Sequence, residues 1–291
     1  RSEPEEGTAN RVIPVPRGKM VGGSSAINGL VYVRGQTLDY DTWGQLGNRS
    51  WTWERVSKVF QRMENFDGGD DEVRGRNGPL GISEVPDQNP LYDASISAAQ
   101  SAGYPHTSDY NGLDQEGVGK TQATIKAGRR MSAARCYLEP ASRRPNLEIV
   151  TEAMTQHLAL EGKRCTGVVY RKNGKDYTGK CNREVILSAG AVSSPQILEL
   201  SGIGDPEILK KYGITVRHEL PSVGENFRDH IASRINWKVT MPGVSYNEKA
   251  RGLGLIGQML QYATTGGGFF SLPSTPVVAF VKTRPEMETP D

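Results

Sequence analysis

Two adjacent glycines and two adjacent serines, followed closely by an asparagine, mark the stretch Gly18–Asn28 (GKMVGGSSAIN). Paired glycines give the backbone freedom that side chains forbid, and they let a flat or phosphorylated ligand approach the main chain. The serines supply small hydrogen-bond donors, and Asn28 supplies both a donor and an acceptor. The stretch therefore has the chemistry of a close ligand contact, although a surface turn uses the same residue types.

General bases are scarce, because the chain has four histidines. His230 is the best candidate among them, since the carboxylate of its neighbour Asp229 could orient the imidazole ring. A structural role is the simpler interpretation of this residue. The remaining histidines stand in loop or strand contexts and are expected at surface or core positions: His106, His157 and His218.

Metal and disulfide chemistry find little support in the sequence. The three cysteines, Cys136, Cys165 and Cys181, are odd in number and form no CxxC or His-spaced set. They therefore indicate neither a disulfide framework nor a zinc site. The acidic run at 67–72 lacks the spacing of a calcium loop, so we interpret it as a solvated loop. No metal site is predicted.

A formal dinucleotide-binding pattern, G-x-G-x-x-G, occurs at Gly252–Gly257 (GLGLIG). The residues before it, SYNEKAR, do not form a buried apolar strand, and Val277 stands where an acidic residue would be required. We therefore reject the pattern as a fingerprint. Its continuation, LIGQMLQYA, predicts a packed helix instead.

The composition bounds the class of protein. The chain has 291 residues, 36% of them hydrophobic, with 34 glycines and 17 prolines, which suits a loop-rich globular enzyme of one or two domains. A net charge of +2 does not indicate a nucleic-acid-binding protein. No run of about 18 apolar residues predicts a membrane span. The first residue is not Met, and the lone sequon at Asn48–Ser50 is weak evidence for secretion, so no compartment is assigned.

Several segments combine helical spacing of apolar residues with start and stop signals. The pattern in 39–64 falls into two parts, and Ser50 or Thr52 could cap the second. Pro195 would occupy the first turn of a helix that starts near Ser194. The predicted helices are 39–64 in two parts, 91–103, 194–202 and 205–212.

Strand signals concentrate after residue 145. The Asn173-Gly174 pair, which follows the strand-like run 166–171, predicts a hairpin turn. The run at 184–188 is short and apolar, as a buried parallel strand would be, and it leads through Ala189–Ala191 into a helix. Strand, glycine turn and helix in this order bring a nucleotide to a helix N-terminus. The predicted strands are 147–150, 166–171, 184–188 and 277–281.

Two long segments carry a resemblance to a known family. The first is Gly18–Asn28, continued by Tyr32, Gly35 and Asp41 at fixed offsets, and the second is Gly190–Gly204 (GAVSSPQILELSGIG). They resemble the two signature patterns of the glucose–methanol–choline (GMC) flavoprotein oxidoreductases and occur in the family's order. The segments DYDTW, RMSAARCYLEPASRRPNLEIVTEA and SVGENFRDH extend the likeness over nearly the whole chain. It is most similar to the choline and alcohol dehydrogenase branch.

The resemblance implies that the glycine–serine turn lies against FAD. The backbone at Gly22 and Gly23 would approach the cofactor, Ser24 would donate to the pyrophosphate region, and 28–31 would line the flavin side. Some family members tether the flavin through a His where this chain has Ile27, so non-covalent FAD is expected. The implied contacts are Val21, Gly22, Gly23, Ser24, Asn28, Gly29, Leu30, Val31, Thr155, Ala189 and Gly190. Thr155 would touch the adenine through its main chain, at a position where the family more often has Val.

The implied fold is of the mixed α/β class. An FAD-binding Rossmann-like domain would be interleaved with a substrate domain built on an antiparallel sheet. Residues 1–60 and 145–235 would belong to the first, and 61–144 and 236–291 to the second or to connecting structure. Family members begin with a G-x-G-x-x-G unit and end with a segment that carries the catalytic His. The chain is therefore expected to be a central portion, with no catalytic residue of its own, and His230 is read as structural.

The implied activity is oxidation of a primary alcohol to the aldehyde. A base takes the hydroxyl proton while hydride passes to flavin N5, and the electrons then pass to a quinone, a dye-like acceptor or oxygen. Two alternatives stay open. One is a hydroxynitrile lyase on the same scaffold, and the other is a truncated module without catalysis.

Overall fold

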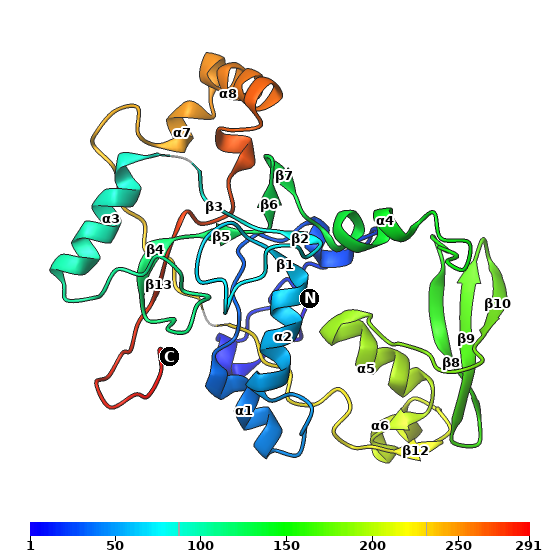
Figure 1. Cartoon of the computed structure of the whole chain (residues 1–291). Helices are drawn as coiled ribbons and strands as arrows, with labels where there is room; N and C mark the ends of the chain where they lie inside the picture. Colours follow the sequence, from blue (N-terminus) through cyan, green and yellow to red (C-terminus); the bar gives the residue numbers. More distant parts are fainter. Residues whose placement is uncertain (87, 231) are drawn as a thin grey trace. The chain divides into compact units, whose positions relative to one another are not determined.

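In this computed structural model, the structure describes residues 1–86, 88–230 and 232–291, which divide into two compact units (Figure 1). Unit 1 comprises Arg1–Leu147 and Lys238–Asp291, and unit 2 comprises Glu148–Trp237. Each unit is described by itself. No helix among the described residues combines the length and the apolarity that crossing a membrane requires.

Unit 1 contains most of the helices, interspersed with short strands. Its helices are α1 (Thr37–Gln45), α2 (Trp53–Met63), α3 (Pro90–Ser101), α4 (Glu139–Ala141), α7 (Tyr246–Lys249) and α8 (Gly252–Thr265), with 3₁₀ turns η1 (Glu6–Thr8), η2 (Gly23–Ala26) and η4 (Phe269–Ser271) and a π-helical turn η3 (Ala134–Leu138). Its strands are β1 (Glu64–Asn65), β2 (Leu80–Gly81), β3 (Ser83–Glu84), β4 (Gly117–Lys120), β5 (Gln122–Ala123), β6 (Ile125–Lys126), β7 (Arg129–Arg130) and β13 (Val277–Phe280).

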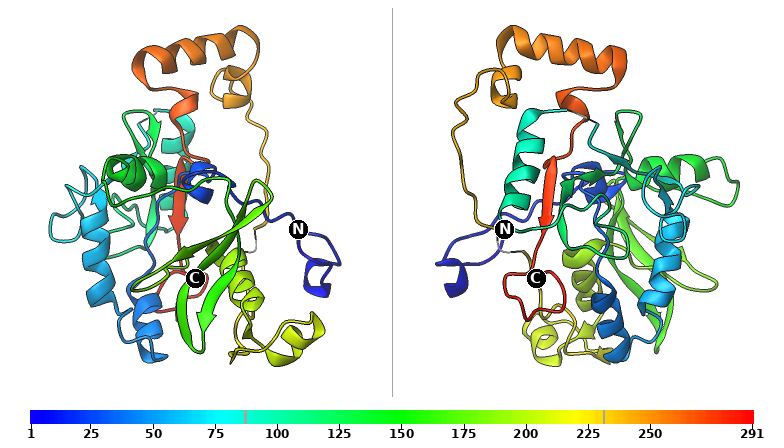
Figure 2. Two further views of the ribbon diagram at one scale, coloured as in Figure 1. Left: turned by 90° about the vertical axis from the view of Figure 1, so that its right-hand side faces the viewer. Right: turned by 60° about the vertical axis from the view of Figure 1, so that its left-hand side comes forward.

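Residues from the two chain segments of unit 1 meet in one sheet. Strand β13 pairs antiparallel with β4, with Val277 opposite Lys120 and Phe280 opposite Gly117. Helix α3 lies beside β13 in the views of Figures 1 and 2. The late segment 238–291 is therefore an integral part of the unit that the first residues build.

Unit 2 is built on a three-stranded antiparallel sheet in the order β10-β9-β8. The predicted hairpin forms, and both turn residues are left-handed, with φ of +52° at Asn173 and +75° at Gly174, which suits a type I′ turn. The elements are β8 (Met154–Glu161), β9 (Arg164–Lys172), β10 (Lys175–Lys180), α5 (Gly190–Leu200), β11 (Ile203–Gly204), α6 (Pro206–Lys211) and β12 (His218–Glu219).

The mixed α/β class predicted from the sequence is confirmed, but several element predictions are wrong. The segments 147–150 and 184–188 form no strand, because no described residue pairs with them, and Ile186 is 80% exposed. Helix α5 begins at Gly190 rather than near Ser194, so Pro195 lies inside it. Helix α8 forms as predicted, but most of its residues are exposed, so it is not the buried, packed helix that the sequence predicts. Its contacts are chiefly with α7 and η4, and Leu253 is 85% exposed.

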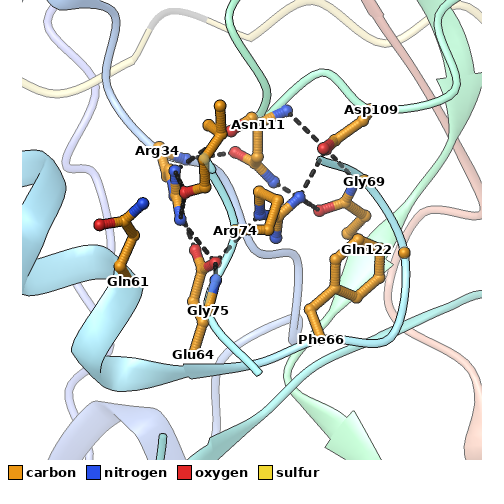
Figure 3. Close-up of polar contacts among 12 residues, drawn as sticks. Arg34, Gln61, Glu64, Phe66, Gly69, Arg74, Gly75, Asp109, Asn111 and Gln122 are labelled. Carbon is orange, nitrogen blue, oxygen red and sulfur yellow. Dashed lines mark hydrogen bonds and ion pairs between the residues drawn. The ribbon is translucent and has the colours of Figure 1, made fainter. Parts of the chain in front are cut away.

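The centre of unit 1 is a buried polar network beside an apolar cluster (Figure 3). Glu64 is fully buried, and its carboxylate accepts hydrogen bonds from Arg34 Nε at 2.6 Å and Arg74 Nε at 3.0 Å. Arg74 Nη1 also donates to Gln122 Oε1 at 2.9 Å and pairs with Asp109. The apolar cluster consists of Tyr32, Phe66, Leu80, Ile82 and Cys136.

Charge balance makes this network tolerable in the interior, since two arginines face two carboxylates. Burial alone would raise the pKa of Glu64. Hydrogen bonds from Arg34 and Tyr32 and the positive charges of Arg74 and Arg34 outweigh burial, so the pKa of Glu64 is lowered. The carboxylate is thereby held ionised between its two cations.

Candidate functional site

The glycine–serine stretch folds into a tight turn around η2. Gly22 and Gly23 both have left-handed backbones, with φ of +94° and +54°, which side chains rarely adopt. The hydroxyl of Ser24 accepts a hydrogen bond from the backbone N–H of Gly18 at 3.1 Å. The N–H groups of Ile27 and Asn28 donate to the carbonyl of Ser24. The left-handed glycine pair and the Ser24 hydroxyl thus both contribute to the closure of the turn.

Residues 130–133 hold this turn from outside. Arg130 Nη1 donates to the carbonyl of Asn28 at 2.8 Å, to Asn28 Oδ1 at 2.7 Å and to the carbonyl of Ser25 at 3.3 Å. The hydroxyl of Ser25 donates to the carbonyl of Gly22 and accepts from the N–H of Ala133 at 2.9 Å. The turn is therefore cross-linked to β7 and to the start of η3.

One side of the turn is packed and the other is open. A Cβ added at Gly22 would lie 3.2 Å from the Cβ of Ala134. A Cβ added at Gly23 would meet no atom within 4 Å, and the same holds for Gly190 in unit 2, where φ is +88°. An open, left-handed glycine is what a close approach of a ligand to the backbone requires. The residues present therefore fit the FAD contact that the resemblance implies.

Most of the sequence-predicted contact residues lie in this turn and in the segment after it. Leu30 is buried and has a left-handed backbone, with φ of +69°. Its N–H donates to Asn28 Oδ1 at 3.3 Å, and its carbonyl accepts from the N–H of Thr124 at 2.8 Å. Val31 forms an isolated bridge with Ala123. Residues 21–24 and 28–31 are thus contiguous parts of one local structure in unit 1.

The other predicted contacts belong to unit 2. Thr155 lies on β8 opposite Tyr170, next to a bulge between Thr155 and His157. Ala189 caps α5, and its N–H donates to Ser194 Oγ at 3.1 Å. Gly190 is the first residue of that helix, whose first N–H groups have no intrahelical partners.

A cavity of about 430 Å³ adjoins the flavin-side segment. Tyr92 Oη donates to Tyr246 Oη at 3.2 Å, and the rings of Tyr246 and Phe269 are 5.5 Å apart. The cavity wall is largely aromatic and apolar, with one arginine. Its lining residues are Asn28, Gly29, Leu30, Tyr92, Arg130, Tyr246, Phe269, Leu272, Pro273, Ser274 and Pro276. Gly29 is required here, because an added Cβ would lie 2.3 Å from Ser274 Oγ.

The sequence did not predict the aromatic wall, because its residues come from α3, α7 and η4, far apart in the chain. All four histidines are exposed and none lines the cavity. Asp229 Oδ1 accepts from the backbone N–H of His230 at 2.8 Å. This is not the contact between the carboxylate and the imidazole ring that would orient His230 as a general base. The described part of the chain groups no three His, Cys, Asp or Glu side chains suited to a metal ion.

Comparison with curated proteins places these features in context. A family model described as GMC oxidoreductase matches residues 6–232. The chain is 42% identical over 295 residues to the oxygen-dependent choline dehydrogenase of Brucella suis biovar 1 (strain 1330). That match covers 100% of this chain and 52% of the relative. The chain thus spans about half the length of the curated relatives that it matches.

The chain also matches solved structures over about half of their length. An FAD-dependent oxidoreductase from Chaetomium thermophilum matches with a TM-score of 0.84 and 27% identity, over 96% of this chain and 51% of that one. Pyridoxine 4-oxidase from Mesorbium loti matches with a TM-score of 0.72 and 34% identity, over 76% of this chain and 44% of that one.

Proposed function

The chain belongs to the GMC oxidoreductase family, and from this premise we propose that it forms part of a flavoenzyme that oxidises a primary alcohol to the aldehyde. One observation carries the proposal. Asn28, Gly29 and Leu30 belong to the segment that the family resemblance assigns to the flavin side, and the same residues line the aromatic cavity. A substrate in this cavity would therefore meet the flavin-side segment directly.

The proposed cofactor is FAD without a covalent link. Open space over Gly23 and Gly190 and the closed turn around Ser24 support this part of the proposal. Ile27 carries no nucleophile where some family members have a tethering His. The residues proposed to hold FAD are Val21, Gly22, Gly23, Ser24, Asn28, Gly29, Leu30, Val31, Thr155, Ala189 and Gly190. Residues 1–60 and 145–235 remain the proposed FAD-binding domain.

FAD, when bound, supplies the hydride acceptor for alcohol oxidation. The chain's own part is to bind the alcohol, and the rings of Tyr92, Tyr246 and Phe269 support this because they line the cavity. The base that takes the hydroxyl proton is proposed to lie outside residues 1–291. Choline is the first alcohol to test, because relatives at about 42% identity are named choline dehydrogenases and aromatic rings bind quaternary ammonium groups.

The test is a visible absorption spectrum of the natively purified full-length protein, followed by anaerobic addition of choline and other primary alcohols. Flavin bands that an alcohol bleaches would support the oxidoreductase. Bands that no alcohol bleaches would favour a hydroxynitrile lyase, and a spectrum without flavin would favour a module without catalysis. Flavin that stays with acid-precipitated protein would contradict the non-covalent proposal. Oxygen consumption would distinguish an oxidase from an enzyme that needs a quinone or dye.

A further inference from the structure

We propose that Arg130 is a positioning residue that fixes Asn28 and the flavin-side segment after it, an inference that rests on the proposed function. Its Nη1 reaches three acceptors: the carbonyls of Ser25 and Asn28 and the side-chain Oδ1 of Asn28. Both the main chain and the side chain of Asn28 are therefore tied to a single guanidinium nitrogen. Arg130 also lines the cavity, so this tie lies at the proposed site itself.

The tie matters because Leu30, two residues after Asn28, has a strained backbone. Its φ is +69°, a left-handed conformation that is unfavourable for a residue with a side chain and that persists only where its surroundings enforce it. Asn28 Oδ1 accepts from the N–H of Leu30, and the same oxygen accepts from Arg130. Without the guanidinium, Asn28 would be free to rotate and release the N–H of Leu30.

Arg130 is itself held in place by its hairpin. Strands β6 and β7 pair Ile125 with Arg130, and Ile125 is buried. At the tip of this hairpin, Tyr262 Oη of α8 donates to the carbonyl of Gly128 at 3.1 Å. Arg130 is therefore a side chain on an anchored strand, as a positioning role requires.

The neighbouring Arg129 offers a matched control. Alternate residues of a strand point to opposite faces. Arg129 is exposed, and its side chain forms no hydrogen bond or ion pair with the residues that the structure describes. Replacing either arginine by Gln removes one positive charge from the same strand, but only Arg130→Gln removes the tie to Asn28.

The experiment compares full-length wild type, Arg130→Gln, Arg130→Lys and Arg129→Gln. Amide hydrogen exchange is followed in peptides covering 18–31, and the flavin-to-protein ratio is measured after gel filtration. We expect Arg130→Gln to accelerate exchange in this segment by about tenfold or more and to lower the flavin ratio, with Arg129→Gln unchanged. Arg130→Lys keeps the positive charge but carries it as an ammonium group on a flexible stem instead of a planar guanidinium, so its values should fall between the two. If Arg130→Gln fails to fold, the comparison of Arg130→Lys with Arg129→Gln tests the same tie.

Two outcomes would overturn the proposal. Exchange in 18–31 that is equal in the Arg130 and Arg129 variants would show that no tie exists. Faster exchange with an unchanged flavin ratio would show that the tie does not serve the cofactor. If the wild type itself holds no flavin, the proposed function fails, and the exchange measurement alone still decides whether Arg130 fixes Asn28.

Discussion

At the scale of residues, Gly23 and Gly162 have the same left-handed backbone conformation, with φ of +54° and +59°. Residues with a side chain rarely adopt it. A Cβ at either position would meet no atom within 4 Å. A substitution therefore causes similar backbone strain at both, roughly 1–2 kcal/mol. The difference is in location, because Gly162 lies in the turn between β8 and β9, whereas Gly23 lies in the turn proposed to contact FAD.

We expect Gly23→Val to abolish FAD binding, because its branched side chain would fill the open space that the cofactor needs. Gly162→Val should lower the melting temperature about as much as Gly23→Val does, but the protein should keep its flavin. The measurement is the flavin-to-protein absorbance ratio of each purified variant. A normal ratio in Gly23→Val would refute the proposed position of the cofactor.

At the scale of elements, Asn89 joins two walls of the cavity. It is buried, its Oδ1 caps α3 by accepting from the N–H of Leu91 at 3.0 Å, and its Nδ2 donates to the carbonyl of Val244 at 2.9 Å. Helix α3 carries Tyr92, and Tyr246 begins α7 just after Val244. One amide side chain thus sets the spacing between the two tyrosines.

Asn89→Ala is expected to lower the free energy of unfolding by about 1–3 kcal/mol, since it removes a helix cap and leaves a buried carbonyl unpaired. If the cavity binds the alcohol, KM should rise more than kcat falls. Asp205→Ala is the control, because Asp205 caps α6 of unit 2 through the N–H of Glu207 at 2.7 Å. That variant should lose stability without a change in KM. An equal KM in both variants would argue against the cavity as the substrate site.

Elements with local signals were predictable, and elements that depend on distant partners were not. The Asn173-Gly174 turn and the helix ends at Gly103 and Gly213 depend on residues within a few positions of each other. The run 184–188 has the composition of a buried strand, but a strand needs neighbours, which the described residues do not provide. The glycine–serine turn was found because its chemistry is contiguous. The aromatic wall was not found, because sequence spacing does not record which helices meet.

At the scale of the whole molecule, the buried network ties unit 1 together. Glu64 lies at the end of α2, Arg34 precedes α1, and Arg74, Asp109 and Gln122 come from later segments. Because the pKa of Glu64 is lowered on folding, the unfolded chain binds a proton more readily. The stabilisation is therefore complete above the unfolded pKa of about 4.3 and is lost as pH falls through the lower folded value.

Glu64→Gln is expected to destabilise the protein by about 3–5 kcal/mol near neutral pH, because it leaves two buried arginines without their shared carboxylate. The loss of stability on acidification should also be shallower than in the wild type. Thermal unfolding at several pH values measures both effects. Asp67→Asn, whose exposed carboxylate pairs with Lys126, serves as the control and should differ little from the wild type. A wild-type acid profile in Glu64→Gln would contradict the role given to Glu64.

The pairing of β4 with β13 also has a consequence for biosynthesis. The ribosome completes β4 at Lys120, then makes all of unit 2, and only afterwards reaches Val277. At about 5–20 residues per second, the interval lasts on the order of 8–30 seconds. Throughout it, one edge of β4 carries backbone groups that await their partner strand, the kind of edge on which nascent chains aggregate. Slowed translation between these two strands would therefore lower the yield of soluble protein without any change in sequence.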